Sequence, residues 1–188
     1  MSISGQNLSV VIVTLKSEKV INKCIDSIGQ NVPIIVVENS SNHKFKHDLE
    51  SRYQNLKCIL SGSNLGMGAG SNAGIKKANT DYVFILNPDV TLEPNTLDEI
   101  FLASKKLTEF TILSPINADI NFPNYKTKKI PKDENTPFQV DYVDGFSMLI
   151  DKNKFNNNIY FDEKFFLFLE NDDLFSLKEL YIIIRLLF

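Results

Sequence analysis

Residues 8–15, LSVVIVTL, form a continuous apolar run that is rich in β-branched side chains. Such a run is typical of a strand that is covered on both faces, as the strands of parallel sheets are. Residues 17–29 carry apolar side chains at helical spacing, and residues 32–39, VPIIVVEN, repeat the strand pattern. The start of the chain therefore predicts a strand, a helix and a second strand, which is the repeating unit of a parallel sheet.

The same alternation continues as far as Pro115. Further strands are expected at residues 56–60 and 81–89, and further helices at residues 43–53, about 70–79 and 93–107, the last with Pro94 in its first turn. Strands and helices that alternate at this spacing predict right-handed crossovers and a mostly parallel sheet with helices on both faces. The expected fold class is therefore α/β and Rossmann-like.

Beyond Pro115 the pattern weakens. Residues 117–139 are polar and hold three of the seven prolines, which favours a loop or lid-like insertion. Residues 142–150, YVDGFSMLI, restore the strand pattern. Residues 180–188 are strongly apolar, but they are too few to cross a membrane, which takes about 20 residues.

The composition is that of an ordinary globular protein. The chain has 188 residues, of which 43% are hydrophobic, and its 20 basic and 23 acidic side chains give a formal net charge of -3. This balance leaves no basic excess to neutralise phosphates, so we expect no nucleic-acid partner. Cys24 and Cys58 are too few for a disulfide framework or a zinc site, and we expect both to be buried in a protein of the reducing cytoplasm. The N-terminal residues lack the basic-then-apolar order of a signal peptide.

Asp89 is the first candidate for chemistry. It ends a strand that is expected to be buried, and open α/β sheets bind ligands at the carboxyl ends of their strands. With Asn87 beside it, its carboxylate could hold a divalent cation that bridges diphosphate oxygens. The alternative is that Asp89 only caps a turn that begins at Pro88. Glu38 and Asn39 end the second strand, where a nucleoside could sit or where the chain simply turns.

Residues 62–74, GSNLGMGAGSNAG, contain five glycines and two asparagines, which argues against a regular element. Glycine lets backbone N–H groups approach a phosphate or sugar closely, and asparagine tolerates left-handed turns. The stretch could equally be a flexible connection. It also contains Gly68-x-Gly70-x-x-Ala73, with Asp89 about 20 residues further on, a loose dinucleotide fingerprint that leaves open an oxidoreductase-type binder. Against this, the glycines begin several residues past the strand, and the strand is the third and not the first.

Residues 170–174, ENDDL, place three acids directly after the apolar run FFLFL. Carboxylates at the edge of a buried segment can have raised pKa values and act as bases. The alternative is an ordinary helix N-terminus, where the helix dipole favours acids.

Taken together, these segments resemble the family 2 glycosyltransferases of the GT-A type, especially the rhamnosyltransferase-like branch that builds bacterial surface polysaccharides. NLGMGAGSNAGI, from residue 64, is similar to the family's NxGfaxgxNxGi, and FILNPDV, from residue 84, to its degenerate DxD motif. VVENSS, from residue 36, is similar to the nucleoside-binding VVDNxS, with glutamate in place of aspartate. VDGFSMLI resembles the strand that lines the acceptor site, and FDEKFFLFLENDDL resembles the segment that carries the catalytic base.

The resemblance implies inverting transfer of a sugar, such as rhamnose, from a nucleotide-diphosphate sugar to a hydroxyl acceptor. It implies that Asp89 holds Mg²⁺ or Mn²⁺ and that a base deprotonates the acceptor. Asn171 stands at the family's usual base position, and because an amide cannot take a proton, Glu170 or Asp172 would have to serve. The implied substrate-binding residues are Thr14, Glu38, Asn39, Asn64, Gly66, Asn72, Asn87, Asp144 and Gly145.

The resemblance also implies an organisation and partners. It implies a GT-A domain over residues 1–174, with a nucleotide-sugar-binding half at residues 1–115 and an acceptor and base half at residues 140–174. The expected donor is a dTDP- or UDP-sugar and the expected acceptor is lipid-linked or a glycan, in the cytoplasm or, by peripheral association, at the inner face of the cell membrane. The family continues with an arginine-bearing helix, which would fall on residues 174–188. Residues 175–188 lack that arginine and are expected to be a truncated or frameshifted tail, so a non-catalytic remnant is a further alternative.

Overall fold

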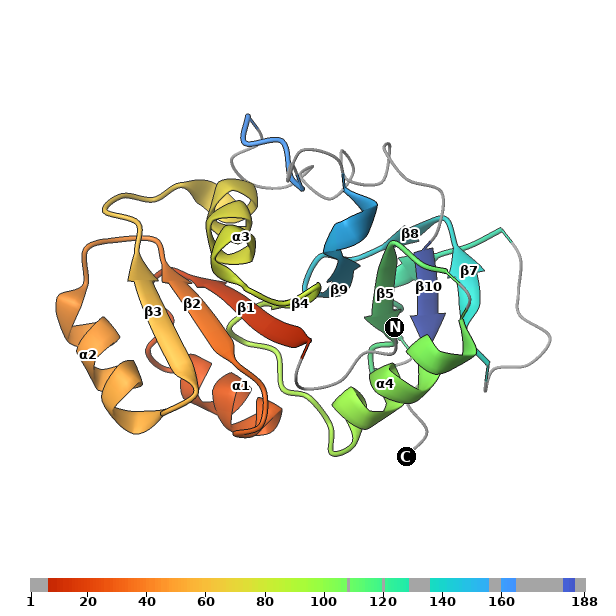
Figure 1. Ribbon diagram of the computed structural model, residues 1–188, viewed down its shortest axis with the longest axis horizontal. Coiled ribbons are helices and arrows are strands. Elements are labelled where there is room, and N and C mark those ends of the chain that lie inside the picture. The colour runs from red at the N-terminus through yellow and green to blue at the C-terminus, as the bar shows by residue number, and fades with distance from the viewer. Residues whose placement is uncertain are drawn as a thin grey trace.

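The computed structural model describes residues 7–107, 109–119, 121–128, 136–155, 160–164 and 181–184. Its main element is an eight-stranded sheet with the order β3-β2-β1-β4-β9-β5-β10-β7 (Figure 1). The strands of this sheet are β1 (Leu8–Thr14), β2 (Ile34–Glu38), β3 (Leu56–Leu60), β4 (Tyr82–Leu86), β5 (Ile112–Pro115), β7 (Phe138–Val140), β9 (Ser147–Asp151) and β10 (Tyr181–Ile184). The α-helices are α1 (Ile21–Ile28), α2 (His43–Arg52), α3 (Gly66–Lys77) and α4 (Thr96–Lys106).

The large sheet is parallel on one side and mixed on the other. β3, β2, β1 and β4 run parallel. β9 runs antiparallel between β4 and β5, while β10 runs parallel to β5 and antiparallel to β7. A small second sheet pairs β6 (Tyr125–Lys126) with β8 (Tyr142–Val143), and a short 3-10 helix (Lys152–Lys154) follows β9. The predicted α/β fold with a mostly parallel sheet is confirmed.

Helices cover both faces of the sheet, as predicted. Along β1 the side chains alternate, so that Val10 and Ile12 pack in one core cluster with α1, α2 and α4, whereas Val11 and Val13 pack in a second cluster with α3. Figure 1 shows α3 on one side of the sheet and α1, α2 and α4 on the other. Every residue of β1 is buried, which explains why its sequence is a continuous apolar run.

The glycine-rich stretch forms a helix, which corrects the prediction of an irregular loop. α3 begins at Gly66 and not near residue 70. The reason is close packing on β1: a Cβ atom at Gly74 would lie 2.4 Å from Cγ1 of Val11, and one at Gly70 would lie 2.7 Å from Cγ1 of Val13. Because only glycine allows this approach, the helix retains residues of low helical propensity.

Three other boundaries differ from the prediction. α4 begins at Thr96, directly after Asn95 with its left-handed φ of 71°, so Pro94 precedes the helix instead of opening it. The strand expected at residues 142–150 is divided, because β8 pairs with β6 in the small sheet while β9 joins the large sheet. The stretch 117–139, expected to be a loop, contains β6 and the first residues of β7.

The apolar end of the chain contributes a strand. Tyr181–Ile184 forms β10 between β5 and β7, where the family resemblance predicted part of a helix. Its three consecutive isoleucines are β-branched and favour a strand. The neighbouring residues 165–180 and 185–188 lie outside the described part of the chain. Among the helices that the structure describes, none is both long and apolar enough to cross a membrane.

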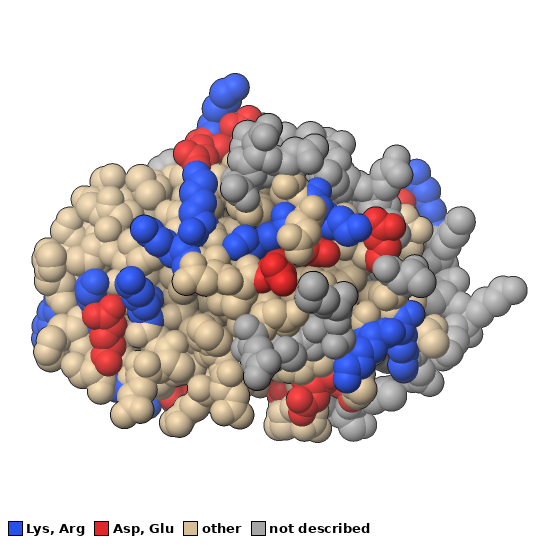
Figure 2. Space-filling model, in the orientation of Figure 1, with Lys and Arg blue, Asp and Glu red and all other residues tan. Residues whose placement is uncertain are grey.

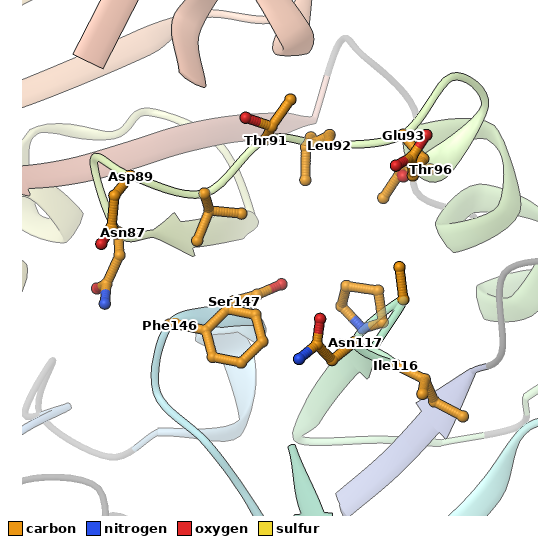
Figure 3. A pocket seen from close by; sticks show the side chains of 13 residues that line it. Asn87, Asp89, Thr91, Leu92, Glu93, Thr96, Ile116, Asn117, Phe146 and Ser147 are labelled. Carbon is orange, nitrogen blue, oxygen red and sulfur yellow. The ribbon is translucent and has the colours of Figure 1, made fainter. Parts of the chain in front are cut away.

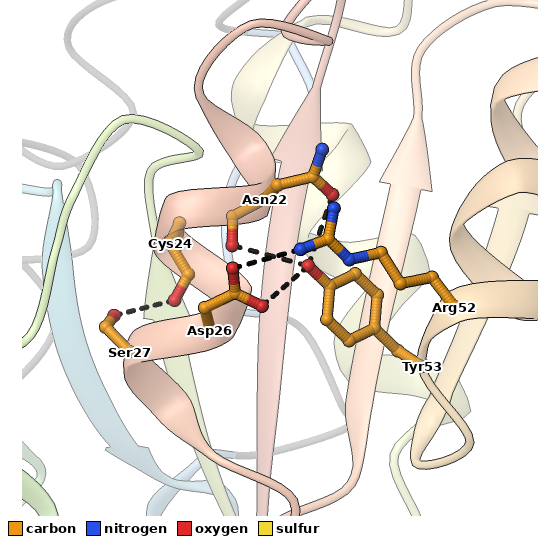
Figure 4. Close-up of polar contacts among 6 residues, drawn as sticks. All are labelled: Asn22, Cys24, Asp26, Ser27, Arg52 and Tyr53. Carbon is orange, nitrogen blue, oxygen red and sulfur yellow. Dashed lines mark hydrogen bonds and ion pairs between the residues drawn. The ribbon is translucent and has the colours of Figure 1, made fainter.

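Polar contacts fix α1 against the end of α2 (Figure 4). The hydroxyl of Tyr53 donates to Oδ1 of Asp26 at 2.8 Å, and Arg52 forms an ion pair with Asp26 at 3.3 Å. Burial, together with the hydrogen bond and the charge of Asp26, raises the pKa of Tyr53 to about 12, so its hydroxyl stays protonated and can donate. Within α1, the hydroxyl of Ser27 donates to the carbonyl of Cys24 at 2.6 Å.

Candidate functional site

The carboxyl ends of β1 and β2 bring Thr14, Glu38 and Asn39 together. Thr14 and Glu38 are register partners, and the N–H of Asn39 donates to the carbonyl of Thr14 at 2.8 Å. All three residues are buried, with exposed fractions of 2%, 2% and 4%. The structure thus gathers three of the predicted substrate-binding residues at one point of the sheet edge where α/β folds bind ligands.

Two buried side-chain atoms at this point lack a hydrogen-bond partner. In the described part of the chain, neither Oγ1 of Thr14 nor Oδ1 of Asn39 is paired. The amide nitrogen of Asn39 is used, since it donates to the carbonyl of Gly66 at 2.9 Å and ties β2 to α3. An unpaired buried polar atom costs about 1–3 kcal/mol, so such atoms are typical of places where a ligand or an ordered water supplies the partner.

Glu38 is a buried carboxyl group with a raised pKa. Burial is the largest cause of the raised pKa, the hydrogen bond from the hydroxyl of Ser40 opposes it, and the negative charge of Glu18 adds to it. The hydroxyl of Ser40 donates to Oε1 of Glu38 at 2.7 Å. Glu38 is therefore oriented by a neighbour while its charge is poorly solvated, which favours a ligand that can donate a hydrogen bond to it.

Asn64 and Gly66 shape the turn into α3. Oδ1 of Asn64 accepts a hydrogen bond from the N–H of Gly66 at 3.0 Å, and Gly66 has a left-handed φ of 81°. Because the carbonyl of Gly66 also holds the Asn39 amide, this turn places the start of α3 beside the end of β2.

Asn72 uses its side chain to hold another segment of the chain. It is buried within α3, and its amide nitrogen donates to the carbonyl of Phe161 at 2.8 Å and to Oε1 of Glu163 at 3.0 Å. Its Oδ1 accepts a hydrogen bond from the N–H of Phe161 at 3.1 Å. Lys76, one helical turn further on, forms an ion pair with Glu163 at 3.6 Å. The structure thus gives Asn72 a positioning task, and its substrate-binding role stays a prediction.

The loop after β4 carries Asn87 and Asp89 and is held from two sides. The N–H of Asn87 donates to the carbonyl of Phe146 at 2.9 Å, on the segment that leads into β9. The N–H of Leu92 donates to the hydroxyl of Ser27 on α1 at 3.0 Å. These contacts fix the path of the backbone that positions Asp89.

Both cysteines are buried, as predicted. The thiol of Cys24 donates to the carbonyl of Asn87 at 3.6 Å. Burial, with the negative charge of Asp89 as a smaller cause, raises the pKa of Cys24 to about 12. Burial is also the main reason why the pKa of Cys58 rises to about 11. Both thiols are therefore protonated at neutral pH, and Cys24 packs next to the loop as a weak donor.

A pocket of about 450 Å³ opens beside Asp89 (Figure 3). Its walls come from the loop after β4, the start of α4, the end of β5 and the residues that lead into β9. The lining residues are Asn87, Asp89, Val90, Thr91, Leu92, Glu93, Thr96, Pro115, Ile116, Asn117, Ala118, Phe146 and Ser147. Figure 3 shows Asn87 and Asp89 at one end, Glu93 and Thr96 at the other, and Ser147 on the wall between.

The sequence did not indicate Thr96 and Ser147 as site residues. Their exposed fractions are 2% and 1%, and neither hydroxyl has a hydrogen-bond partner among the described residues. In the sequence, Thr96 belongs to a helical pattern and Ser147 to a strand pattern, so nothing local distinguishes them from ordinary buried hydroxyls. The fold alone places the first residue of α4 and the first residue of β9 in one pocket.

The other predicted site residues are Asp144, Gly145, Glu170 and Asp172. Asp144 and Gly145 lie partly buried in the turn between β8 and β9, where the N–H of Asp144 donates to the carbonyl of Asn124 at 2.8 Å. This turn leads into the pocket wall. Glu170 and Asp172, the two candidate bases, lie outside the described residues.

Asp89 fits a divalent cation that is shared with a ligand. Among the described residues, no three His, Cys, Asp or Glu side chains gather to hold a metal by themselves. Mg²⁺ is commonly bound by one or two carboxylates together with substrate phosphates and water. One carboxylate beside an amide, at the edge of the sheet and next to unpaired polar atoms, is therefore a suitable protein contribution.

Charged side chains of both signs are interspersed on the face shown in Figure 2. Ion pairs such as Lys76 with Glu163 and Arg52 with Asp26 join neighbouring elements at the surface. Exposed pairs of this kind contribute about 0–1 kcal/mol each, so they affect local geometry more than stability.

The geometry does not support the dinucleotide fingerprint. In a dinucleotide site, the glycines form the tight turn between a strand and the helix that follows it. Here β3 ends at Leu60, α3 begins at Gly66, and Gly68 and Gly70 lie within the helix. Gly70 provides room for the side chain of Val13 and not for a phosphate.

Known proteins resemble this chain in sequence and in fold. Residues 9–175 match glycosyl transferase family 2. The chain is 27% identical over 185 residues to the low-salt glycan biosynthesis hexosyltransferase Agl10 of Haloferax volcanii, covering 87% of this chain and 59% of that protein. It is 21% identical over 213 residues to an N-acetylglucosaminyl-diphospho-decaprenol L-rhamnosyltransferase of Mycobacterium tuberculosis, covering 89% and 68%.

A similar fold occurs in the structure of S. aureus TarS 1–349 in complex with UDP-GlcNAc. The TM-score is 0.70 at 19% sequence identity, and the similarity covers 95% of this chain and 56% of that chain. The present chain thus spans less than two thirds of the hexosyltransferase and of the TarS chain. The family match includes the strand ends at Thr14 and Asn39, the loop with Asp89 and the pocket beside it. Because this match extends over most of its length, the chain belongs to glycosyl transferase family 2.

Proposed function

We propose that this chain binds a nucleotide-diphosphate sugar at the carboxyl edge of its sheet and transfers the sugar to a hydroxyl acceptor with inversion. The observation that carries the proposal is the pair of unpaired buried atoms, Oγ1 of Thr14 and Oδ1 of Asn39, at the carboxyl ends of β1 and β2, of which β1 is the neighbour of β4 and its Asp89 loop. A nucleoside with hydroxyl and imide groups supplies the partners that these atoms lack.

Different residues contact different parts of the donor. Glu38 and Asn39 contact the nucleoside, and the turn at Asn64 and Gly66 shapes the space for the diphosphate. Asp89 faces the diphosphate, and Mg²⁺ or Mn²⁺ held there would stabilise the charge that builds on the leaving group. Asn87 supports the same loop through its backbone contact with the segment before β9.

A carboxylate must take the proton of the acceptor hydroxyl. Asn171 cannot do so, and we propose Glu170 or Asp172 for this task. Asp144 and Gly145 would lie near the acceptor, because their turn leads into the pocket beside Asp89. The assignment is tested by single-turnover transfer with Glu170→Gln and Asp172→Asn, where the variant that loses transfer but retains donor binding identifies the base.

The relatives narrow the substrate class. One relative is named as a hexosyltransferase and one as a rhamnosyltransferase that acts on a decaprenol-linked sugar, while TarS has been solved with UDP-GlcNAc. We therefore propose a UDP- or dTDP-sugar donor, rhamnose or a similar hexose as the transferred sugar, and a lipid-linked or glycan acceptor of surface polysaccharide synthesis. A lipid-linked acceptor would bring the protein to the inner face of the membrane.

Calorimetric titration with UDP and dTDP, in the presence and absence of Mn²⁺, tests the donor site. We expect binding that depends on Mn²⁺ and that weakens at least about tenfold in Asp89→Asn, because the amide keeps the shape but loses the charge that attracts the cation. Asp81→Asn is the matched control, since Asp81 is exposed at the opposite end of β4.

Three results would contradict the donor-site proposal. Equal Mn²⁺-dependent affinity of Asp89→Asn and the parent would remove Asp89 from the site. Binding of NAD or NADP in place of UDP and dTDP would instead favour an oxidoreductase-type dinucleotide site. Failure of every nucleotide to bind would favour the non-catalytic remnant.

A further inference from the structure

Lys16 has a backbone conformation that a lysine does not favour. It follows the end of β1 by two residues, and its φ of 56° lies in the left-handed region. In this conformation the Cβ atom crowds the neighbouring carbonyl oxygen, which glycine avoids and asparagine tolerates. Residues that are kept in such a conformation cluster at ligand sites, which makes Lys16 a candidate for binding.

The turn around Lys16 is held on both sides. Before it, the carbonyl of Thr14 accepts a hydrogen bond from the N–H of Asn39 at 2.8 Å. After it, the carbonyl of Ser17 accepts a hydrogen bond from the N–H of Ile21 at 3.1 Å, at the start of α1. Because both ends are tied to neighbouring elements, the surrounding backbone imposes the left-handed conformation on Lys16.

This turn lies in the middle of the proposed donor edge. β1 is the neighbour of both β2 and β4, and β4 leads into the Asp89 loop. In the register of β1 and β4, Ile12 lies beside Leu86. Lys16 follows Ile12 by four residues, and Asp89 follows Leu86 by three. The two turns therefore leave the sheet at the same edge and next to each other.

Lys16 is the cation of this edge. The ends of β1, β2 and β4 and the turns after them comprise residues 14–18, 38–41 and 87–91, and their charged side chains are Lys16, Glu18, Glu38 and Asp89. Lys16 is exposed, and no described residue forms a hydrogen bond or an ion pair with its side chain. Its ammonium group is therefore free for a ligand, at a place where an anion would otherwise meet only carboxylates.

We propose that Lys16 binds the diphosphate of the sugar donor and supplies a part of the binding that needs no metal, an inference that rests on the proposed donor site. An ammonium group forms charge-assisted hydrogen bonds with phosphate oxygens, and its flexible stem adapts to their position. The same contact stabilises the charge that the diphosphate gains as it leaves the sugar. The diphosphate is thus held from the β1 side by Lys16 and from the β4 side by the cation at Asp89.

Calorimetric titration with UDP and dTDP, in Mn²⁺ and separately in EDTA, tests the role of Lys16. The parent should retain weaker but measurable binding in EDTA. Lys16→Asn should weaken binding at least about tenfold in both conditions, as expected for a lost hydrogen bond to a charged group, and Lys16→Arg should largely retain it. Uridine and thymidine, which have no phosphate, should bind the parent and Lys16→Asn equally.

Three comparisons separate this role from a structural one. The melting temperature of Lys16→Asn should not fall, because asparagine tolerates the left-handed conformation. Lys77→Asn is the matched control, since it removes an exposed lysine at the far end of α3, whose start lies beside Asn39, and it should leave UDP binding unchanged. In EDTA, Asp89→Asn should not weaken UDP binding, because without a cation its carboxylate only repels the phosphates.

Several outcomes would overturn the role of Lys16. These are absence of nucleotide binding by the parent in EDTA alone, equal affinity of Lys16→Asn and the parent for UDP, an equal loss for UDP and uridine, or a fall in melting temperature. Failure of the parent to bind any nucleotide in Mn²⁺ would instead contradict the donor site itself. In that case pyrophosphate still tests Lys16, since weaker pyrophosphate binding by Lys16→Asn supports its role and equal binding overturns it.

Discussion

Glu38 shows how a single buried carboxyl group can lower the stability of the fold at neutral pH. Its carboxyl group is buried at the end of β2, and burial raises its pKa above the ordinary value of 4.5. The folded state therefore holds this proton more tightly than the unfolded state does. The contribution of this group to stability is present below pH 4.5 and is lost as the pH rises through the raised pKa.

Glu38→Gln is accordingly expected to stabilise the protein at pH 7.5. The amide has nearly the same shape and carries no charge to desolvate, so the melting temperature should rise at pH 7.5 and the gain should shrink towards pH 4.5. Circular dichroism melts across this pH range measure it. Glu99→Gln, in the first turn of α4, removes the same charge outside the edge site and should show no such gain. A lower melting temperature of Glu38→Gln at every pH would contradict the account.

At the scale of the element, α3 depends on its fit to β1. A Cβ atom at Gly74 would lie 2.4 Å from Cγ1 of Val11 and 3.2 Å from Cγ2 of Val37. Valine is stiff about χ1 and cannot easily turn its methyl groups away. Gly74→Ala should therefore lower the free energy of unfolding by about 1–3 kcal/mol, even though alanine is the better helix former.

A double-mutant cycle with Val11→Ala tests the cause of that loss. Removing the valine methyl groups makes room for the new Cβ atom, so Gly74→Ala should cost much less in the Val11→Ala background. Urea unfolding of the four proteins measures the coupling. An equal loss of unfolding free energy in both backgrounds would mean that the substitution destabilises the helix itself and not its contact with β1.

The strands and helices also show which parts of the fold could be predicted from the sequence and which could not. Strands β1, β2 and β4 were predictable because every one of their residues is buried, so each reads as an unbroken apolar run. Glu38, Asn39 and Asp89 could be placed at the carboxyl edge of the sheet from the sequence because they lie at or just after the ends of such runs, and their roles in binding stay predictions. The helical conformation of the glycines was not, since it depends on contacts with Val11 and Val13, which are far away in the sequence.

The pocket could not be predicted for the same reason. Thr96 and Ser147 are separated along the chain, and their common environment arises only when β9 inserts beside β4. The strand at Tyr181–Ile184 was missed because its partners, β5 and β7, are distant in sequence, and short apolar runs fit a helix as well as a strand.

At the scale of the whole molecule, Asn72 joins the two halves that the sequence predicted. It lies on α3 in the first half, and its three hydrogen bonds hold Phe161 and Glu163 in the second. Asn72→Ala leaves the N–H and the carbonyl of Phe161 without these partners, which should cost about 1–3 kcal/mol per unsatisfied buried group.

Hydrogen exchange of the Phe161 amide measures the local stability of this contact. The amide of Phe161 should exchange at least about tenfold faster in Asn72→Ala, as a loss of more than about 1.4 kcal/mol requires. Lys76→Ala removes only the exposed ion pair to Glu163 and should change the exchange little. Unchanged protection of Phe161 in Asn72→Ala would show that other contacts hold residues 160–164.

The position of β10 has a consequence for how the chain reaches its fold. β1 pairs with β2 and β2 pairs with β3 across one helical crossover each, and β4 pairs with β1, so these four strands need only residues 7–86. β5 and β7, in contrast, are joined by β10, whose residues 181–184 follow them by dozens of positions. Because β10 follows all the other strands of the large sheet along the chain, the part of the sheet formed by β1 to β4 can pair during synthesis before the side formed by β5, β10 and β7. Residues 7–86 would then be ordered while the strand that joins β5 to β7 is still to be made.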